Sequence, residues 1–214
     1  MNCGKLILVR HGLSVYNDQN RFTGWKDVDL NEQGVSEAEQ AVILLKEINF
    51  DMAFTSKLKR ANDTLDLILK GIEQEIPIEK DLALNERDYG DLVGRNKAEA
   101  AKEFGDEQVQ IWRRSYDIPP PGGESLKDTA DRVIPYLNEK ILPEVYNGKN
   151  VIVSAHGNSI RAIVMALKKF TPEEILKTEI GWCEPWIFDF ENNKLVNLDI
   201  KARPHAKSMS KLPN

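Results

Sequence analysis

The chain has 214 residues and a mass of 24.3 kDa, enough for one large α/β domain with its own apolar core. Its 34 acidic and 29 basic side chains give a formal net charge of −5, which argues against nucleic acid or an anionic membrane as the general partner. Two cysteines, Cys3 and Cys183, are too few for a disulfide framework and lack the spacing of metal ligands. No apolar stretch approaches the roughly 20 residues that span a bilayer, and no signal peptide is apparent. We expect a cytoplasmic protein.

The first half of the chain alternates between strand and helix patterns. Leu6–Val9 is a short apolar run that predicts a buried strand, and a long polar loop follows it. A helix is predicted from Asn31 as N-cap, with its apolar residues at helical spacing up to Ile48. Met52–Thr55 predicts a second strand, and Ser56 is the expected N-cap of the helix after it.

The middle of the chain is less regular. Short strands are predicted at Ile76–Ile78 and Leu82–Leu84, and the charged region 85–123 is expected to be an insertion over the sheet. From Ser125, which begins a capping box with Asp128, a long helix is predicted to about residue 145, bent by its prolines.

The last part of the chain adds a strand from Val151, a helix over Ser159–Lys168 and a short helix after the capping box at Thr171. A hairpin of Trp186–Phe190 and Lys194–Ile200 follows. These elements predict an α/β fold, a three-layer sandwich with a mostly parallel central sheet flanked by helices. We expect a single domain over residues 1–200, with 85–123 as an inserted cap region and 201–214 as a basic tail.

Two His-Gly pairs directly follow predicted strands. His11-Gly12 comes after Leu6–Val9 and Arg10, and His156-Gly157 comes after the strand from Val151. Because parallel strands end at one edge of the sheet, where α/β proteins bind ligands, we expect the two imidazoles to meet there. A neutral ring nitrogen is a nucleophile near neutral pH, so the pattern favours phosphoryl transfer to His11. A core histidine at a strand end is the alternative.

Two further segments carry charged residues suited to this chemistry. Arg60 follows the second strand, and its guanidinium can reach back to the same sheet edge and bind phosphate oxygens in a bidentate way. Glu86 would repel an anion beside a phosphorylated histidine, so its expected role is proton transfer with a substrate hydroxyl. Lys97, Arg113 and Arg114 would then meet the other anionic groups of the substrate. For each of these charged residues the alternative is a solvated surface position.

Six segments carry a more specific signal, and they are Arg10-His11-Gly12, Thr55-Ser56 with Arg60-Ala61, Leu84–Arg87 with Tyr89-Gly90, Ile111–Tyr116, Glu124–Thr129 and Ala155–Ser159. In this order, over nearly the whole chain, they resemble the cofactor-dependent phosphoglycerate mutases of the histidine phosphatase superfamily. The Arg-His-Gly start alone indicates only the superfamily. The segment around Glu86 and the Trp-Arg-Arg-Ser-Tyr run are what indicate the mutase branch.

The resemblance implies a role for individual residues. His11 would be the phosphohistidine, primed by 2,3-bisphosphoglycerate as cofactor, and Glu86 would be the acid and base. Arg10, Arg60 and a charged His156 would hold the phosphoryl oxygens. It implies no metal and a glycolytic or gluconeogenic exchange of 2-phosphoglycerate and 3-phosphoglycerate. The residues implied to bind the rest of the substrate are Ser14, Asn17, Thr23, Gly24, Arg87, Tyr89, Lys97, Arg113, Arg114, Gly157 and Asn158.

The sequence departs from the family pattern in two places. Leu13 stands where the family usually has Glu or Gln, which leaves the hydrogen bonding around His11 open. The loop between Pro121 and Glu124 is short, so a monomer and a homo-oligomer both remain possible. The tail from Lys201 has only basic charges, and it is either a solvated terminus or a lid over the site.

Three functions compete at this point. The first is a mutase that works through phospho-His11. The second is a phosphatase, in which water attacks the same phosphohistidine. The third is a phospho-ligand binding module without turnover. The presence of Glu86, Arg113 and Arg114 favours the mutase, and the presence of both histidines argues against a module without catalysis.

Overall fold

The apolar runs at the two ends of the chain pair at the centre of one mixed sheet. The computed structural model describes residues 3–213, so Met1, Asn2 and Asn214, at the ends of the predicted domain and tail, lie outside the described residues. The sheet has the strand order β3-β2-β4-β1-β5-β6. Its strands are β1 (Cys3–Arg10), β2 (Met52–Thr55), β3 (Ile78–Lys80), β4 (Asn150–Ala155), β5 (Trp186–Glu191) and β6 (Lys194–Ile200).

The first four strands are parallel, and only the C-terminal hairpin departs from that direction. β1 pairs in parallel with β4, β4 with β2, and β2 with β3. On its other side β1 pairs antiparallel with β5, which in turn pairs antiparallel with β6. The predicted mostly parallel sheet is therefore confirmed, and its two central strands are β4 and β1.

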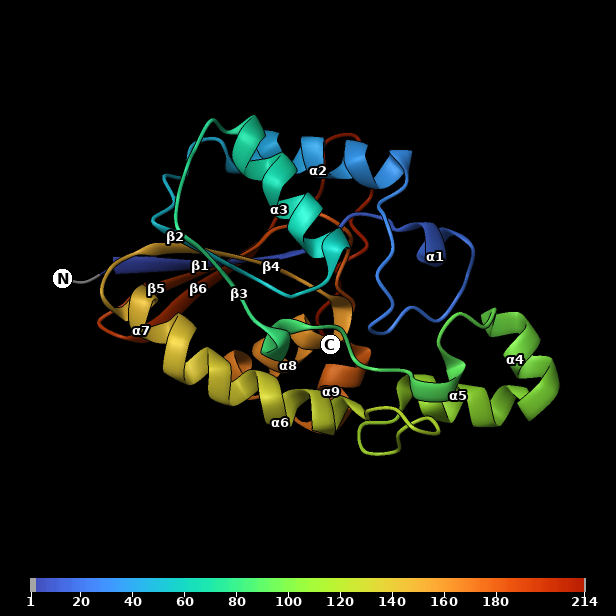
Figure 1. Ribbon diagram of the computed structural model, residues 1–214. Coiled ribbons are helices and arrows are strands. Elements are labelled where there is room, and N and C mark those ends of the chain that lie inside the picture. Colours follow the sequence, from blue (N-terminus) through green and yellow to red (C-terminus); the bar gives the residue numbers. More distant parts are fainter. Residues whose placement is uncertain (1–2, 214) are drawn as a thin grey trace.

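Helices cover both faces of the sheet, as the three-layer prediction requires (Figure 1). α2 (Glu32–Leu45) and α3 (Lys59–Gly71) lie on one face, and α6 (Leu126–Tyr136), α7 (Leu142–Tyr146), α8 (Gly157–Lys168) and α9 (Pro172–Lys177) lie on the other. The alternation along β1 explains this, because Ile7 and Val9 pack toward one face while Leu6 and Leu8 pack toward the other. Since all four are fully buried, β1 reads as a continuous apolar run.

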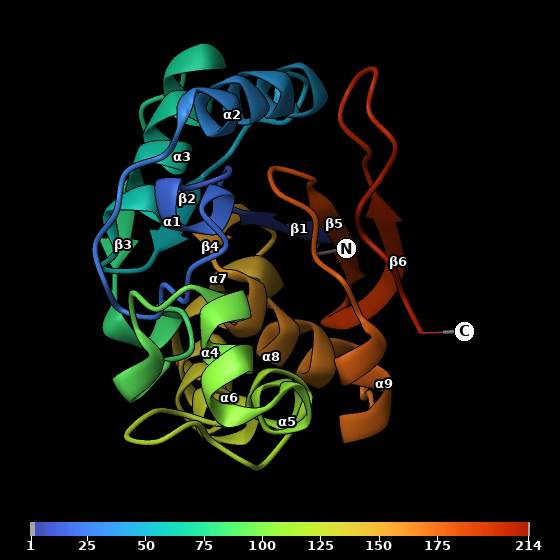
Figure 2. The same cartoon turned by 90° about the vertical axis from the view of Figure 1, so that its right-hand side faces the viewer.

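The region 85–123 lies at the end of the sheet where β1 and β4 end (Figures 1 and 2). It contains α4 (Lys97–Phe104) and α5 (Asp106–Arg114), which pack on a small apolar cluster of their own around Phe22, Leu92 and Val109. α1 (Val15–Asp18) lies nearby in the loop after β1. This placement brings the last turn of α5 and the first residue of α4 to the carboxyl ends of the parallel strands.

Most predicted helix starts are confirmed. Asn31 caps α2 by accepting a hydrogen bond from the Gly34 amide, and capping boxes begin α6 at Ser125 and α9 at Thr171. The long predicted helix is continuous but changes to a wider π turn over Leu137–Ile141, in the stretch between its two prolines.

Some local predictions are wrong. The helix predicted over Ser159–Lys168 begins earlier, at Gly157. Ser56 does not cap α3, because its hydroxyl is engaged with His156 and the Leu58 amide, and the N-cap is Leu58. Leu82–Leu84 is a short 3-10 turn, since the Asp81 side chain accepts the Ala83 amide and curls the chain. The third strand is Ile78–Lys80, later than predicted.

Candidate active site

The two His-Gly pairs lie side by side at the carboxyl end of the sheet. Arg10 is opposite Ala155 in the β1–β4 register, and the His11 amide donates to the Ala155 carbonyl at 3.0 Å. The His11 and His156 rings are consequently 5.1 Å apart between centroids and tilted by 59°. The expected meeting of two imidazoles at one sheet edge is confirmed.

The hydrogen bonds of His11 determine which ring nitrogen carries its lone pair. Its Nδ1 lies 2.7 Å from the Gly12 carbonyl oxygen, which can only accept, so Nδ1 carries the proton and the lone pair is on Nε2. Arg60 Nε donates to that Nε2 at 3.3 Å. Burial, Arg60 and Arg10 together lower the pKa of His11 well below its usual value, against a small opposing effect of the Gly12 hydrogen bond. The ring is therefore a neutral nucleophile.

His156 has a different environment. It is fully buried and lies beside the cavity rather than on its lining, with Nε2 bonded to the Ser56 hydroxyl at 2.8 Å. Burial, Arg60 and His11 lower its pKa well below the usual value. Without a bound anion, burial and the nearby cations therefore favour a neutral His156 rather than the charged form that we expected. An anionic phosphoryl group would have to supply the charge that raises this pKa.

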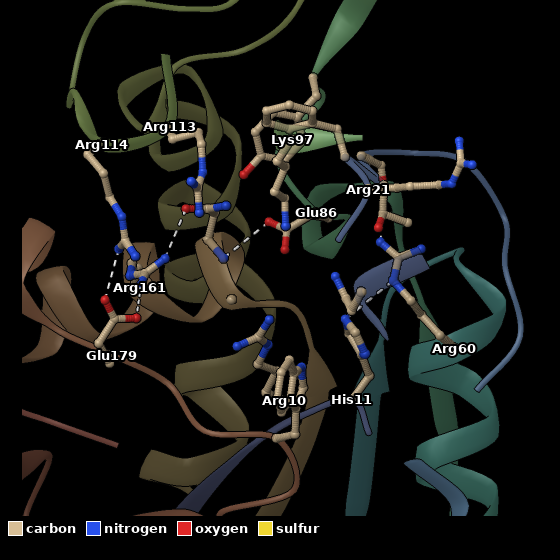
Figure 3. A pocket seen from close by; sticks show the side chains of 18 residues that line it. Arg10, His11, Arg21, Arg60, Glu86, Lys97, Arg113, Arg114, Arg161 and Glu179 are labelled. Carbon is tan, nitrogen blue, oxygen red and sulfur yellow. Dashed lines mark hydrogen bonds and ion pairs between the residues drawn. The ribbon is translucent and has the colours of Figure 1, made fainter. Parts of the chain in front are cut away.

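Arg10 and Arg60 lie on either side of His11 (Figure 3). Arg60 is buried, and its two terminal nitrogens donate to the carbonyls of Gly24 and Lys26, which fixes the guanidinium plane against His11. Burial lowers the pKa of Arg60 to about 10, so it remains a cation at neutral pH. Arg10 donates to the Ile180 carbonyl at 2.8 Å and stacks over the Trp182 ring at 5.0 Å.

Glu86 faces the histidines from the inserted region. Its Oε1 accepts the backbone amides of Arg87 at 2.8 Å and of Asn158, at the start of α8, at 3.1 Å. Gly157 leaves space beside the other oxygen, because a Cβ there would lie 3.8 Å from Glu86 Oε2 and 3.6 Å from the Arg10 guanidinium. One carboxylate oxygen is thus anchored and the other points into a gap that Gly157 keeps open.

A cavity of about 300 Å³ joins these groups, and its lining contains more arginine and lysine side chains than acidic ones. In Figure 3 Arg113, Arg114 and Arg161 lie on the side opposite His11 and Arg60, with Lys97 between them. Glu179 pairs with Arg114 and Arg161 at 2.8 Å each, so it neutralises part of this charge. The predicted residues that line the cavity are Arg10, His11, Asn17, Thr23, Gly24, Arg60, Glu86, Tyr89, Lys97, Arg113, Arg114, Gly157 and Asn158.

Two predicted binding residues, like His156, lie outside that lining. Ser14 caps α1 and bonds to the Asn17 side chain, so it supports the lining rather than forming it. Arg87 is buried behind the wall, where it donates to the Tyr89 hydroxyl at 3.0 Å and the Arg113 carbonyl at 3.2 Å. Both have a clear part in positioning residues that do line the cavity.

Five lining residues were not predicted from the sequence: Arg21, Phe22, Arg161, Glu179 and Trp182. Arg161 could have been found, because it lies one helical turn after Gly157 on α8. Glu179 and Trp182 could not, since they come from an irregular segment whose path depends on its packing against the end of the chain.

That packing involves residues 203–211, which run back along the wall of the cavity. Glu184 is fully buried and accepts hydrogen bonds from the Ser208 hydroxyl and from the Met209 and Ser210 amides, each at 2.9 Å. Lys211 pairs with Glu179 through two backbone hydrogen bonds. The C-terminal segment therefore fixes the strip 179–184 that carries Glu179, Trp182 and the carbonyl that holds Arg10.

Two features that would indicate other functions are absent from the described residues. Within residues 3–213 no group of three or more His, Cys, Asp or Glu side chains is placed to hold a metal ion. No helix in that range is long and apolar enough to cross a membrane.

Known proteins resemble this chain in sequence over almost its whole length. The family model for the histidine phosphatase superfamily (branch 1) matches residues 6–202. The chain is 57% identical to a 2,3-bisphosphoglycerate-dependent phosphoglycerate mutase of Nitrobacter hamburgensis, over 92% of this chain and 98% of that protein. It is 59% identical to the enzyme of the same name from Bradyrhizobium diazoefficiens, over 89% of this chain and 94% of that protein.

Solved structures share the fold at lower identity. A putative alpha-ribazole-5'-P phosphatase from Escherichia coli superimposes with a TM-score of 0.81 at 22% identity, over 96% of this chain and 98% of that one. A mycobacterial glucosyl-3-phosphoglycerate phosphatase gives a TM-score of 0.76 at 25% identity, over 93% and 98%. One fold thus accommodates both phosphatases and the mutases that this chain resembles in sequence.

Proposed function

The chain belongs to the histidine phosphatase superfamily and, within it, to the 2,3-bisphosphoglycerate-dependent phosphoglycerate mutases, and from this we infer that it interconverts 2-phosphoglycerate and 3-phosphoglycerate through phospho-His11. The observation that carries the mechanism is the neutral His11 with its Nε2 lone pair at the edge of a cationic cavity. Because this reaction belongs to glycolysis and gluconeogenesis, we propose that the protein acts in the cytoplasm.

The residues present fit 2,3-bisphosphoglycerate, which has two phosphates and a carboxylate. Arg10 Nε and His156 Nδ1 are buried and have no hydrogen-bond partner within residues 3–213. Arg10 and Arg60 would hold the transferring group, and Lys97, Arg113 and Arg114 would hold the remaining anionic groups. When bound, the bisphosphate supplies the phosphoryl group that primes His11. No metal is needed in this scheme.

In the transfer, His11 Nε2 forms an N–P bond as the P–O bond to the glycerate oxygen breaks. The departing oxygen takes a proton from Glu86, whose free Oε2 is the positioned oxygen. In the reverse step Glu86 removes the proton from the other hydroxyl as that oxygen attacks phospho-His11. One residue therefore serves as acid in the first half and as base in the second.

The cations act on the charge that develops during transfer. Arg60 is fixed in place by two carbonyls, so it needs no rearrangement to stabilise the equatorial phosphoryl oxygens. Arg10 is fixed similarly by the Ile180 carbonyl and Trp182. A nearby phosphoryl group would favour the protonated form of His156. The Ser56 hydroxyl would then accept a hydrogen bond from His156 Nε2–H.

A coupled enolase assay with and without added 2,3-bisphosphoglycerate tests this function. Strong dependence on the bisphosphate supports the mutase. A phosphatase releases inorganic phosphate from small phosphate esters without such dependence, and a binding module shows no turnover in either condition.

We also propose that the C-terminal segment limits water access to phospho-His11. Its support is the set of contacts that 208–211 make with the wall segment 179–184, beside Arg10. Excluding water separates a mutase from a phosphatase. Deletion of 207–214 should lower mutase turnover and leave hydrolysis of the phosphoenzyme unchanged or faster.

The deletion must be separated from a loss of folding, because it removes the donors to the buried Glu184. Combining it with Glu184→Gln removes the buried charge, and thermal unfolding reports whether the domain stays intact. If folded truncated protein has full mutase activity and an unaltered phosphoenzyme lifetime, the segment has no role as a lid.

A further inference from the structure

Glu37 is a buried carboxylate that the mechanism above does not use. It lies on the inner face of α2 with no exposed surface, next to the loop that follows His11. Its Oε1 contacts Arg203 Nη1 at 3.2 Å and accepts from Gln33 at 3.0 Å, and its Oε2 accepts the Leu13 amide at 2.8 Å. A buried charge is costly unless paired, so this arrangement needs a reason.

The Leu13 amide belongs to the same peptide unit as the Gly12 carbonyl. That carbonyl accepts the Nδ1 proton of His11 at 2.7 Å, and the amide on the other end of the unit donates to Glu37. The sequence of contacts is therefore His11 Nδ1–H to Gly12 C=O, then Leu13 N–H to the Glu37 carboxylate. A negative charge on the amide side polarises the peptide and strengthens its carbonyl as an acceptor, because linked hydrogen bonds polarise one another.

Close backbone packing fixes this geometry. A Cβ on Gly12 would lie 2.2 Å from the Gly34 carbonyl oxygen, and a Cβ on Gly34 would lie 2.2 Å from the Leu13 carbonyl oxygen. Only glycine fits at both positions, so the loop after His11 touches the first turn of α2 directly. Glu37 is on the next turn of the same helix and can therefore reach the Leu13 amide.

Arg203 brings the other end of the chain to this contact. It is nearly buried, and its Nη1 is the cationic partner of Glu37 within residues 3–213. Figure 2 shows the C-terminal segment rising beside α2 before it returns toward α9. The tail thus contributes Arg203 to the contacts around the loop that follows His11. These contacts are separate from those that the tail makes with the cavity wall.

We propose that Glu37 and Arg203 are positioning residues for His11, and that they act through the Gly12–Leu13 peptide to fix the Nδ1–H form of the ring and to stabilise the positive charge that it gains as Nε2 takes the phosphoryl group. The part that concerns phosphoryl transfer rests on the proposed function. Leu13, at the position where the family usually has Glu or Gln, contributes its backbone amide to this contact and buries its side chain.

A purely structural role for the pair makes a different prediction. Replacing a buried ion pair by apolar side chains of similar volume is often neutral or stabilising. If Glu37 and Arg203 served only to stabilise the fold, the folded double variant Glu37→Leu/Arg203→Met would keep its activity. In our proposal the folded double variant loses activity, because the Leu13 amide is left without its carboxylate.

The test uses the full chain, Glu37→Gln, the double variant and Glu39→Gln as control, because Glu39 is an exposed carboxylate on the same helix. Rapid-quench measurement with 2,3-bisphosphoglycerate as probe gives the rate of His11 phosphorylation. We expect it to fall about 10- to 100-fold in both Glu37 variants, the range for second-sphere partners of functional histidines, with little change in KM. Glu39→Gln should match the parent protein.

Imidazole ¹⁵N spectra give a second readout that needs no substrate. His11 is assigned by the signal missing in His11→Ala, and the parent protein should show the Nδ1–H form alone. Both Glu37 variants should show a mixture of ring forms. A single unchanged form with a phosphorylation rate within twofold of the parent would overturn the proposal, as would a double variant that recovers both. If the parent protein itself takes no label at His11, the proposed function fails while the ring spectra still judge the role of Glu37.

Discussion

The two His-Gly strand ends begin from nearly the same sequence pattern and finish with different chemistry. At the end of β1, His11 lines the cavity, holds its proton on Nδ1 through a backbone carbonyl and presents Nε2 beside Arg60. At the end of β4, His156 is buried beside the cavity, with Nε2 turned to the Ser56 hydroxyl. What distinguishes them is the residue that each ring nitrogen contacts, and those partners come from other parts of the chain.

The comparison shows how one strand-end geometry provides both a nucleophile and its electrostatic partner. Parallel neighbours in the sheet place the rings 5.1 Å apart without any special loop. The task of each ring is then set by its hydrogen bonds: a backbone acceptor frees the outer nitrogen of His11, whereas the hydroxyl of Ser56 occupies the corresponding nitrogen of His156.

Exchange of the two histidines for alanine gives the largest expected effect. His11→Ala should lose mutase turnover by at least about 10⁴-fold, since no other nucleophile replaces it. Incubation with labelled 2,3-bisphosphoglycerate should label the parent protein in an acid-labile, base-stable form, as expected of a phosphoramidate, and leave His11→Ala unlabelled. His156→Ala should still take the label, more slowly. Persistent label in His11→Ala would contradict the assignment of His11, rather than His156, as the nucleophile.

Glu86→Gln separates proton transfer from attack by the ring. Turnover should fall about 10²- to 10⁴-fold, the usual cost of losing a general acid and base, while His11 can still be phosphorylated. Steady-state kinetics with the labelling experiment check this. Glu99→Gln is the matched control, because Glu99 is exposed on α4 in the same inserted region. Turnover equal to that of the parent would mean that another group moves the proton.

Ser56→Ala removes the partner of the second ring and also the acceptor of the Leu58 amide. Loss of the hydrogen bond to His156, of about 1 kcal/mol, should reduce turnover roughly fivefold through a less well oriented His156. The imidazole spectrum of His11 should not change, because Ser56 makes its ring contact with His156 while Arg60 still donates to His11 Nε2. The exposed Ser36 provides a control variant, Ser36→Ala. A changed His11 signal would show that the two rings do not have separate partners.

The pH dependence of stability is the smallest expected effect and treats the two rings alike. Both pKa values are lowered in the folded protein, by burial first and by Arg60 second. Below the usual value of 6.5 the unfolded chain binds protons that the folded rings do not, so the free energy of unfolding should fall as pH drops through that range. Denaturant unfolding at several pH values should show this slope, and the double variant His11→Ala/His156→Ala should flatten it. A slope that is the same in both proteins would contradict the neutral rings.

The sequence was sufficient where the physics is local or periodic. The strand at Leu6–Val9, the caps at Asn31, Ser125 and Thr171, and the meeting of His11 with His156 follow from apolar spacing, side-chain capping and the rule that parallel strands end together. The order of the strands in the sheet could not be predicted by these rules, and only the structure shows it.

The sequence was insufficient where long-range packing decides. Ser56 has the composition of an N-cap, but a histidine 100 residues away takes its hydroxyl. Glu179 and Trp182 line the cavity only because the C-terminal segment holds their strip in place, and Glu37 reaches the His11 loop only because two glycine backbones touch. Contacts of this kind have no signature in a window of neighbouring residues.

The place of β1 in the sheet has a consequence for how this chain folds. β1 comes first in the sequence, yet both of its neighbours, β4 and β5, come from the last third of it, and Lys5 bonds to Asp189 across 184 residues. The fold therefore has a high contact order at its centre, which is associated with slow folding. Until the late strands are available, the run Leu6–Val9 is an apolar strand with two open edges, the kind of segment that associates with other chains. The nucleophile at its end can become functional only when the two distant parts of the chain have met.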